Sequence, residues 1–174
     1  MTMNTGKKRL LDFGIFLIST GILVAFDQWT KALAVANLKD QADIQLISGV
    51  LCLHYLENTG AAFGIFQDQR IFLLLLTTII LLCVCYVLWK IPGEKKYIPL
   101  KILCGMITAG GIGNLIDRVR LNYVVDFIYF SLIDFPVFNV ADIYVTTSMI
   151  LLLILVFFYY KDEDFQFLKW KREK

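Results

Sequence analysis

The 174-residue sequence has little charge and a single histidine. Only 18% of its residues are charged, whereas a soluble domain has roughly 25%, and 58% are hydrophobic. One soluble core of this size cannot bury that many apolar side chains. The excess must therefore face lipid. This excludes an ordinary cytosolic enzyme and a disordered chain. The net charge of +2 does not indicate a nucleic-acid partner, and none is expected.

Histidine and cysteine are also too few, or wrongly spaced, for the common metal sites. His54 is the only histidine, so a His-Glu-x-x-His zinc motif is excluded. Cys83 and Cys85 do not have the spacing of a zinc knuckle, and thiols such as Cys52 and Cys104 behave as small hydrophobes in apolar surroundings. We therefore expect no metal, no cofactor and no disulfide.

Four apolar runs are long enough to cross a membrane as helices. The run over 71–89 has no charge and would span about 28 Å, close to the thickness of a bilayer core. We expect spans at about 11–34, 71–89, 98–118 and 137–160, outer segments at 37–70 and 119–136, and a tail at 161–174. A cleaved signal peptide is the alternative interpretation of the first run, although an Ala-x-Ala site is not obvious.

Basic residues predict the orientation of these spans. Twelve lysines and arginines fall on the side of the two termini, against five on the other side. The positive-inside rule places the richer side in the cytoplasm. The twelve are Lys7, Lys8, Arg9, Lys90, Lys95, Lys96, Lys101, Lys161, Lys169, Lys171, Arg172 and Lys174.

The outer segment 37–70 contains stretches of alternating polarity, at 44–47 and 50–56. Such alternation is typical of short strands, here of a small sheet lying on the membrane. The segment 119–136 is expected to be a second outer loop. The predicted fold is thus a single, mainly α membrane domain over 1–174, with four transmembrane helices and a small extracytoplasmic β-rich segment between the first two.

Polar residues gather at the outer ends of the first, third and fourth spans. An ionisable residue in a span costs about 2.5–3.5 kcal/mol on insertion scales, so such residues are functional candidates. Asn114 and Arg118 share one helix face at spacing i, i+4. Asn139 and Asp142 share another at i, i+3, and Asp126 lies among apolar neighbours in the second outer loop.

Asp126 and Asp142 are the candidate catalytic pair. Two carboxylates brought together in a low-dielectric place cannot both ionise, so one keeps its proton. The ionised member can activate a water while the protonated one polarises a carbonyl, which is the chemistry of aspartyl peptide hydrolysis. The sequence leaves open which aspartate holds the proton. Asp134 is a rival member, and a Ser131–Lys31 pair has no support from spacing.

Two further patterns concern the helices behind this pair. Asp27 and Lys31, at i, i+4, form either a structural ion pair in the favoured order or a support that orients the site from behind. Gly105, Ala109 and Gly113 recur at four-residue steps, which lets another helix pack closely.

Two other classes of function remain as alternatives. A proton-coupled transporter would use carboxylates spread through the membrane depth, but the middles of the four spans lack them. A lipid-modifying transferase would use Arg118 to hold a headgroup, but it needs a nucleophile or an acceptor-binding residue that the sequence does not offer.

Five segments together resemble the lipoprotein signal peptidase family, also called signal peptidase II. They lie in the family's order from the first span to the fourth, and each alone is weak. The segments are 27–31 (DQWTK), 58–64 (NTGAAFG), 110–118 (GGIGNLIDR), 125–127 (VDF) and 138–142 (FNVAD).

This resemblance implies an aspartyl endopeptidase of the bacterial inner membrane. Such enzymes remove signal peptides from prolipoproteins at the bond before a diacylglyceryl-modified cysteine, near the outer face of the membrane. The partners would be these substrates and membrane lipid, and we expect a monomer. The implied roles are catalysis by Asp126 and Asp142, substrate binding or support of the pair by Asn58, Asn114, Arg118 and Asn139, and structural support by Asp27, Lys31 and Gly110.

Overall fold

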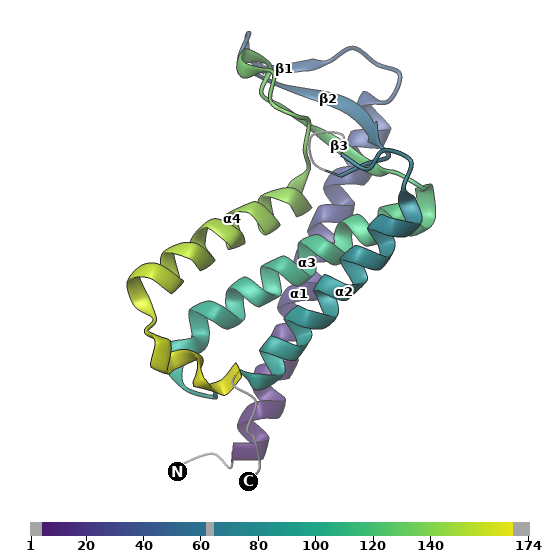
Figure 1. The fold of residues 1–174 in the computed structure, drawn as a ribbon. Coiled ribbons are helices and arrows are strands. Elements are labelled where there is room, and N and C mark those ends of the chain that lie inside the picture. Colours follow the sequence, from purple (N-terminus) through teal and green to yellow (C-terminus); the bar gives the residue numbers. More distant parts are fainter. Residues whose placement is uncertain (1–4, 62–64, 169–174) are drawn as a thin grey trace.

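The computed structural model describes residues 5–61 and 65–168 (Figure 1). Four of its helices are long and apolar enough to cross a membrane, as the sequence predicts, so the chain is a multi-pass membrane protein. Residues 62–64 of the second motif and the basic residues of 169–174 lie outside the described residues. The helices are α1 (Thr5–Leu38), α2 (Arg70–Lys90), α3 (Ile98–Leu121) and α4 (Val140–Ile154), which continues as the π-helical turn η4 (Leu155–Tyr159).

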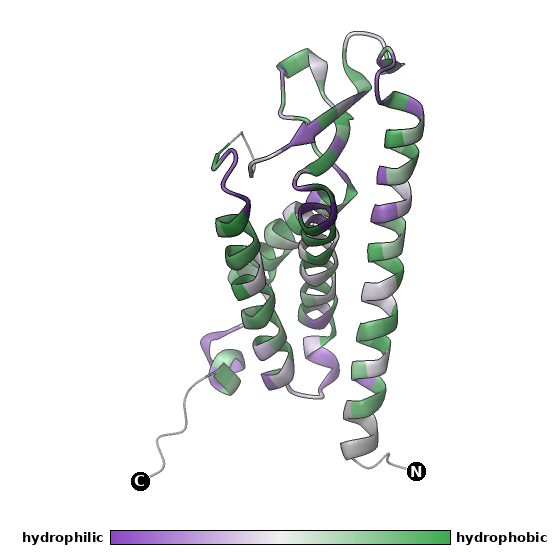
Figure 2. Ribbon diagram, turned by 90° about the vertical axis from the view of Figure 1, so that its right-hand side faces the viewer, coloured by the Kyte–Doolittle hydropathy of each residue, from purple (hydrophilic) through white to green (hydrophobic). Residues whose placement is uncertain are grey.

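The helices differ in how much of their surface faces outward. Leu73 is the one fully buried residue in α2, whereas α3 has buried side chains along its whole length and packs against the other three helices. Hydrophobic residues cover the middle of the helices, whereas the sheet and the helix ends carry both hydrophobic and hydrophilic residues (Figure 2). The bundle is therefore arranged around α3, with apolar surface left for lipid.

Small residues on α3 allow this close packing, as the sequence predicts. A Cβ added to Gly105 would contact Phe16 of α1 at 3.7 Å, and one added to Gly111 would lie 2.9 Å from Leu81 of α2. Ala109 is completely buried. A Cβ would therefore fit against Phe16, whereas at Gly111, which lies outside the predicted pattern, the Leu81 side chain would have to shift.

The end of the bundle away from the start of α1, called the outer end below, carries a three-stranded antiparallel sheet in the order β1-β2-β3 (Figure 1). Strands β1 (Ile44–Ile47) and β2 (Leu51–Asn58) lie between α1 and α2, as predicted. The third strand, β3 (Val124–Tyr129), falls in the segment 119–136, for which a loop was expected. Its first four residues are all buried, so they show no polar–apolar alternation to announce a strand. Pairing of β3 with β2 places Asp126 opposite Leu56.

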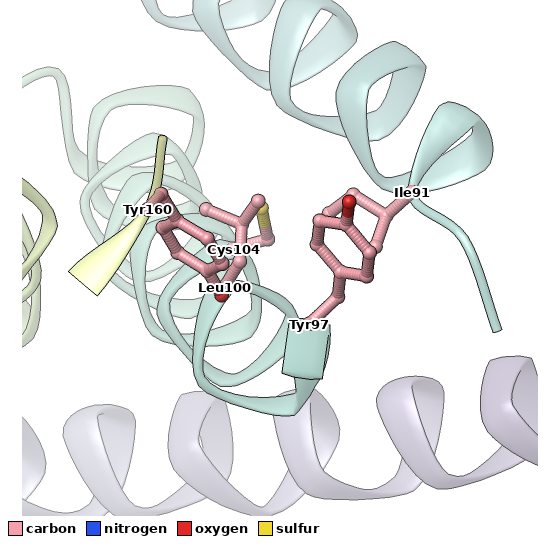
Figure 3. Packing of buried hydrophobic residues seen from close by; sticks show 5 residues of the cluster. All are labelled: Ile91, Tyr97, Leu100, Cys104 and Tyr160. Atoms are coloured by element: carbon pink, nitrogen blue, oxygen red, sulfur yellow. The ribbon is translucent and has the colours of Figure 1, made fainter. Parts of the chain in front are cut away.

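After α4 the chain returns to the end of the bundle at which α1 begins, called the inner end below. Residues Asp162–Leu168 form the 3-10 helix η5, and α1 begins at the same end (Figure 1). A hydrophobic cluster fills this end, with Tyr97 and Leu100 packed near Tyr160 (Figure 3). Part of the expected tail 161–174 is thus folded against the bundle.

Candidate active site

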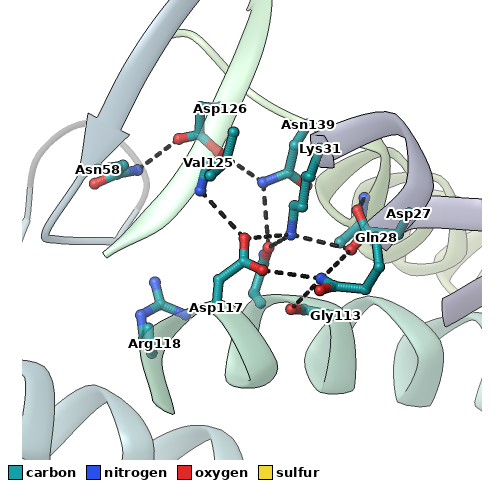
Figure 4. A network of polar contacts seen from close by, with 12 residues as sticks. Asp27, Gln28, Lys31, Asn58, Gly113, Asp117, Arg118, Val125, Asp126 and Asn139 are labelled. Atoms are coloured by element: carbon teal, nitrogen blue, oxygen red, sulfur yellow. Dashed lines mark hydrogen bonds and ion pairs between the residues drawn. The ribbon is translucent and has the colours of Figure 1, made fainter. Parts of the chain in front are cut away.

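Two aspartates from different elements meet at the outer end of the bundle. Asp126 lies on β3 and is 1% exposed, and Asp142 lies in the first turn of α4. Asn139 connects them, because its side-chain amide donates to Asp126 Oδ1 at 2.6 Å and its backbone N–H donates to Asp142 Oδ2 at 3.1 Å. The pair that the sequence singled out is therefore joined through one residue, and Figure 4 shows the contact of Asn139 with Asp126.

Asn139 owes its orientation to the start of α4. It is the N-cap residue, and its side-chain oxygen accepts from the backbone N–H of Asp142 at 3.0 Å, while the Asp142 carboxylate accepts from the N-cap backbone. This reciprocal capping box satisfies backbone donors that a helix start leaves free. Because the Asn139 oxygen is occupied, its amide group must point toward Asp126.

Asn58 holds the other oxygen of Asp126 from the end of β2. Its amide group donates to Asp126 Oδ2 at 2.8 Å, and its oxygen accepts from the backbone N–H of Gly60 at 2.9 Å. Both oxygens of Asp126 therefore have a side-chain donor, one from β2 and one from the start of α4. The strand and the loop after it fix the direction of this carboxylate.

Asn114 performs the same task for Asp142 from α3. Its amide group donates to Asp142 Oδ1 at 2.8 Å, and its oxygen accepts from the Lys31 ammonium at 2.8 Å and from Asn139 at 3.1 Å. An ammonium can only donate, so Lys31 forces the oxygen of Asn114 toward α1. The donor end of Asn114 is thereby left for Asp142.

Lys31 lies between two buried carboxylates. Its ammonium is 3.0 Å from Asp27 Oδ2 and 3.0 Å from Asp117 Oδ2, and all three side chains are less than 5% exposed. Both sequence interpretations of Asp27 and Lys31 describe part of this arrangement: the two form an ion pair, and Lys31 also contacts the site residue Asn114. The cluster joins α1 to α3 directly behind the aspartate pair.

Asp117 and Gln28 are two members of this network that the sequence analysis missed. Asp117 accepts from the Gln28 side chain at 2.9 Å and from the backbone N–H of Val125 at 3.2 Å, which anchors β3 beside Asp126. Gln28 also donates to the backbone oxygen of Gly113 at 3.2 Å. Both residues lie inside the motifs quoted above. The sequence signal for Asp117 was a carboxylate within a predicted span, and its basic partner, Lys31, lies on another helix.

Gly110 and Asp27 set the start of α4 against its neighbours. A Cβ on Gly110 would lie 2.5 Å from the backbone oxygen of Ala141, so only glycine permits this approach. Asp27 Oδ1 accepts from the backbone N–H of Ala141 at 2.9 Å, and the space beside Gly113 is filled by the Asp27 carboxylate. These contacts fix the helix turn that carries Asp142.

Arg118 lies beside the aspartates but contacts neither of them. Its Nη2 donates to the backbone oxygen of Gly60 at 2.8 Å, and the residue is 8% exposed. Its buried Nε has no hydrogen-bond partner within residues 5–61 and 65–168. Arg70, at the start of α2, holds this turn by donating to the backbone oxygen of Arg118 at 2.8 Å. Arg118 and Asn114 were expected to share one role, but their contacts differ: Asn114 contacts Asp142, and Arg118 contacts the loop after β2.

Burial raises the pKa of Asp126 to about 7, and the negative charge of Asp142 adds to this shift. Hydrogen bonds from Asn58 and Asn139 favour the ionised form and limit the rise. A carboxyl group with this pKa holds its proton through much of the neutral range. One member of the pair can therefore act as an acid near pH 7.

The rival residues lie elsewhere. Asp134 is exposed in a left-handed turn, and its Oδ1 accepts from the Tyr129 hydroxyl at 2.6 Å. His54 pairs with Asp43 at 2.8 Å on the exposed part of the sheet. Within the described part of the chain, no group of three or more His, Cys, Asp or Glu residues could hold a metal ion.

Comparison with known proteins identifies the family of this chain. The family model for signal peptidase (SPase) II matches residues 19–158. A lipoprotein signal peptidase of Streptococcus pyogenes serotype M1 is 42% identical over 144 residues, which is 83% of this chain and 90% of the relative. The lipoprotein signal peptidase of Streptococcus thermophilus (strain CNRZ 1066) is 42% identical over 128 residues, or 74% of this chain and 82% of the relative.

Two solved structures of a bacterial membrane enzyme, determined by the in meso method, have the same fold. The first, at 2.3 Å resolution, has a TM-score of 0.71 at 30% identity and covers 92% of this chain and 95% of its own. The second, at 1.9 Å, has a TM-score of 0.71 at 31% identity, with 84% and 95% covered. The family match over most of the sequence, together with relatives at 42% identity, shows that this chain belongs to the signal peptidase II family of membrane peptidases.

Proposed function

We propose that this protein is an aspartyl endopeptidase that removes signal peptides from diacylglyceryl-modified prolipoproteins. Family membership supports the peptidase class and the prolipoprotein substrate. The observation that carries the catalytic type is the joining of Asp126 and Asp142 through Asn139 in a buried, polar site. The bond cleaved is the one before the lipid-modified cysteine.

In the proposed reaction, the ionised aspartate takes a proton from a water whose oxygen attacks the scissile carbonyl carbon. The protonated aspartate donates its proton to the carbonyl oxygen, so a neutral tetrahedral diol forms. When the C–N bond breaks, the leaving nitrogen takes the proton that the first aspartate had received from water, and a hydroxyl of the diol returns a proton to the second aspartate as the carbonyl forms again. The dyad ends with one shared proton, as it began, and its titration is a property of the pair.

The position of each aspartate favours a division of roles. Asp142 lies in the first turn of α4, where the helix dipole stabilises negative charge. Asp126 lies on a strand, and its pKa, raised to about 7, leaves a large protonated fraction at neutral pH. We therefore assign the water-activating base to Asp142 and the carbonyl-polarising acid to Asp126.

Arg118 is proposed to position the substrate rather than the aspartates. Its Nη2 holds the loop after β2 through Gly60, and its Nε is buried without a partner within the described residues. A substrate backbone oxygen would satisfy this free donor. Asn58, Asn114 and Asn139 are proposed to support the dyad through the hydrogen bonds described above.

The proposed orientation places this site at the outer face of the bacterial inner membrane. The positive-inside rule puts both termini in the cytoplasm, and the sheet and the aspartates lie at the opposite end of the bundle (Figure 1). A signal peptide spans from the cytoplasm, so its cleavage site emerges beside Asp126 and Asp142 while the diacylglyceryl chains stay in lipid. A reporter fused after Lys174 should be active only in its cytoplasmic form, and periplasmic activity would overturn this orientation.

The proposed function is tested by cleavage of a purified prolipoprotein in its diacylglyceryl-modified and unmodified forms. We expect cleavage of the modified form before the cysteine, and slow or no cleavage of the unmodified form. Equal cleavage of both forms would contradict the proposed substrate class. Size-exclusion chromatography with light scattering of the same sample tests the expected monomer.

A further inference from the structure

A cavity of about 290 Å³ lies between α1 and α3 at the same end of the bundle. Its wall includes Gln28 and Lys31 from α1, Asp117 and Arg120 from α3, and Val125 from β3. Within the described residues, no side chain of this wall hydrogen-bonds to the carboxylate of Asp126 or Asp142. The cavity therefore does not contact the two carboxylates directly, although it shares Lys31 and Asp117 with the network behind them.

The depth of the cavity is marked by a tryptophan. Trp29 follows Gln28 on α1 and is 58% exposed, and exposed tryptophan rings favour the membrane–water interface. On α1 the lining residues run from Gln28 to Ala36, a rise of about 12 Å along the helix toward the sheet. The cavity thus begins at the interface and extends through the layer that lipid headgroups occupy.

The polar groups in the deeper part of the wall are held by one another. Lys31 lies between two carboxylates, Asp27 and Asp117, and Asp117 also accepts hydrogen bonds from the Gln28 side chain and the Val125 backbone. None of these groups needs a ligand. They form a fixed polar base, and what the cavity binds is decided by its outer part.

The outer part combines one free cation with apolar walls. Arg120 is exposed and, within the part of the chain that the structure describes, has no hydrogen-bond or ion-pair partner. Around it the wall is formed by Val35, Ala36 and Leu121. A guanidinium beside an apolar groove at headgroup depth fits a phosphate joined to an acyl chain, because Arg binds phosphate through its planar fork.

We propose that this cavity binds an anionic phospholipid, with its phosphate on Arg120 and its glycerol and acyl carbons against Ala36 and Leu121. Bound lipid also stabilises the start of β3. Val125 lines the cavity, its N–H donates to Asp117, and it directly precedes Asp126. Lipid binding at this cavity does not depend on peptide cleavage, so a catalytically inactive variant should bind the lipid as well.

Native mass spectrometry of the full chain, released from micelles doped with dioleoyl phosphatidylglycerol or dioleoyl phosphatidylcholine, tests this binding. We expect selective retention of phosphatidylglycerol and a loss of about fivefold in its affinity for Arg120→Gln, the value expected for one basic side chain at an anionic lipid surface. Ala36→Phe, which fills the cavity without changing charge, should lower retention as well. Inorganic phosphate alone should not bind, because it makes no apolar contact.

Lys39→Gln is the matched control. It removes the same charge near the outer end of α1, but Lys39 is already paired with Glu57 at 2.8 Å. Retention by this variant should equal that of the unchanged protein. Equal retention by Arg120→Gln, equal binding of the two lipids, or full retention by Ala36→Phe would each overturn the proposed site.

Discussion

The two ends of the bundle are held together by different chemistry. At the outer end, α1, α3, α4 and β3 meet through buried charges and amides (Figure 4). At the inner end, α2, α3 and the segment after α4 meet through stacked rings, with Tyr97 and Tyr160 centroids 5.8 Å apart (Figure 3). Few polar contacts assist there, among them Lys96 with Asp164 at 2.5 Å.

The two kinds of contact have different consequences for the fold. Apolar contacts are non-directional and tolerate exchange of similar shapes. A chain of donors and acceptors fixes where each group points, and it is expensive to leave half satisfied. The outer end therefore fixes the directions of two carboxylates, whereas the inner end mainly keeps the helices together. Changes at the outer end should alter chemistry or remove a buried partner, and changes at the inner end should only weaken packing.

The largest effect is expected at the aspartate pair. Asp126→Asn and Asp142→Asn should each lower kcat/KM by about 10³-fold or more, because each removes a proton donor or acceptor. The double variant should be no worse than either single one, since the pair acts as a unit. The measurement is accumulation of uncleaved, lipid-modified precursor, with the folded amount in the membrane unchanged.

Asp134→Asn is the control for this pair. Asp134 is exposed, and within the described structure its side chain bonds only to the Tyr129 hydroxyl, so its replacement should have a mild effect. Substantial activity of either dyad variant, or a loss of activity in Asp134→Asn alone, would contradict the assignment of Asp126 and Asp142 as the catalytic pair.

The next effect compares one lysine at each end. Lys31→Met should lower the free energy of unfolding by about 3–5 kcal/mol, because it leaves two buried carboxylates without their counter-ion. Lys96→Met removes an ion pair whose lysine is 39% exposed, and it should lower this free energy by less than about 1 kcal/mol. Thermal unfolding in detergent compares the two, and equal losses would mean that the buried cluster does not stabilise the outer end.

A smaller effect is expected from Arg118→Lys. The charge stays, but the planar fork that reaches Gly60 and leaves Nε free is lost. We expect kcat/KM to fall by about 10- to 100-fold, the range of one or two charge-assisted hydrogen bonds, with the folded amount unchanged. Normal turnover by this variant would reduce Arg118 to an anchor for headgroups.

The pH profile sharpens the assignment of the acid. Below about pH 7 the raised pKa keeps Asp126 protonated. As pH rises through this value the dyad loses its proton, so kcat/KM should fall, approaching about tenfold per pH unit well above the pKa. Asp134→Asn should show the same profile as the unchanged protein. Activity that stays constant from pH 6 to 9 would contradict a protonated aspartate in the reaction.

The sequence made some of these features predictable and hid others. The four spans and the polar residues at their outer ends were predictable, because lipid leaves few reasons for an aspartate or asparagine at that depth. Spacing also brought Asn139 and Asp142 together, but the expected shared helix face was wrong, because Asn139 is the extended N-cap residue before α4. What spacing could not give is the direction of each amide, which depends on Lys31 and on the capping box of α4.

The features that were missed depend on packing between distant segments. β3 is covered on both sides, so its residues do not alternate in polarity, and only its pairing with β2 makes it a strand. Asp117 has its basic partner on α1, more than eighty positions earlier in the chain. A search for i, i+4 partners therefore cannot find it, since α1 and α3 become neighbours only in the folded bundle.

The smallest effect is expected at the inner end. The Tyr160 hydroxyl donates to the backbone oxygen of Lys96 at 3.0 Å, while its ring packs against Tyr97 and Phe165. Tyr160→Phe removes the hydrogen bond and keeps the ring, so the free energy of unfolding should fall by about 0.5–1.5 kcal/mol. Cleavage should stay unchanged, because no dyad residue contacts this cluster. Unfolding and cleavage are measured on the same sample. A loss of activity without a loss of stability would mean that the inner end also influences the chemistry, and the separation between the two ends would not hold.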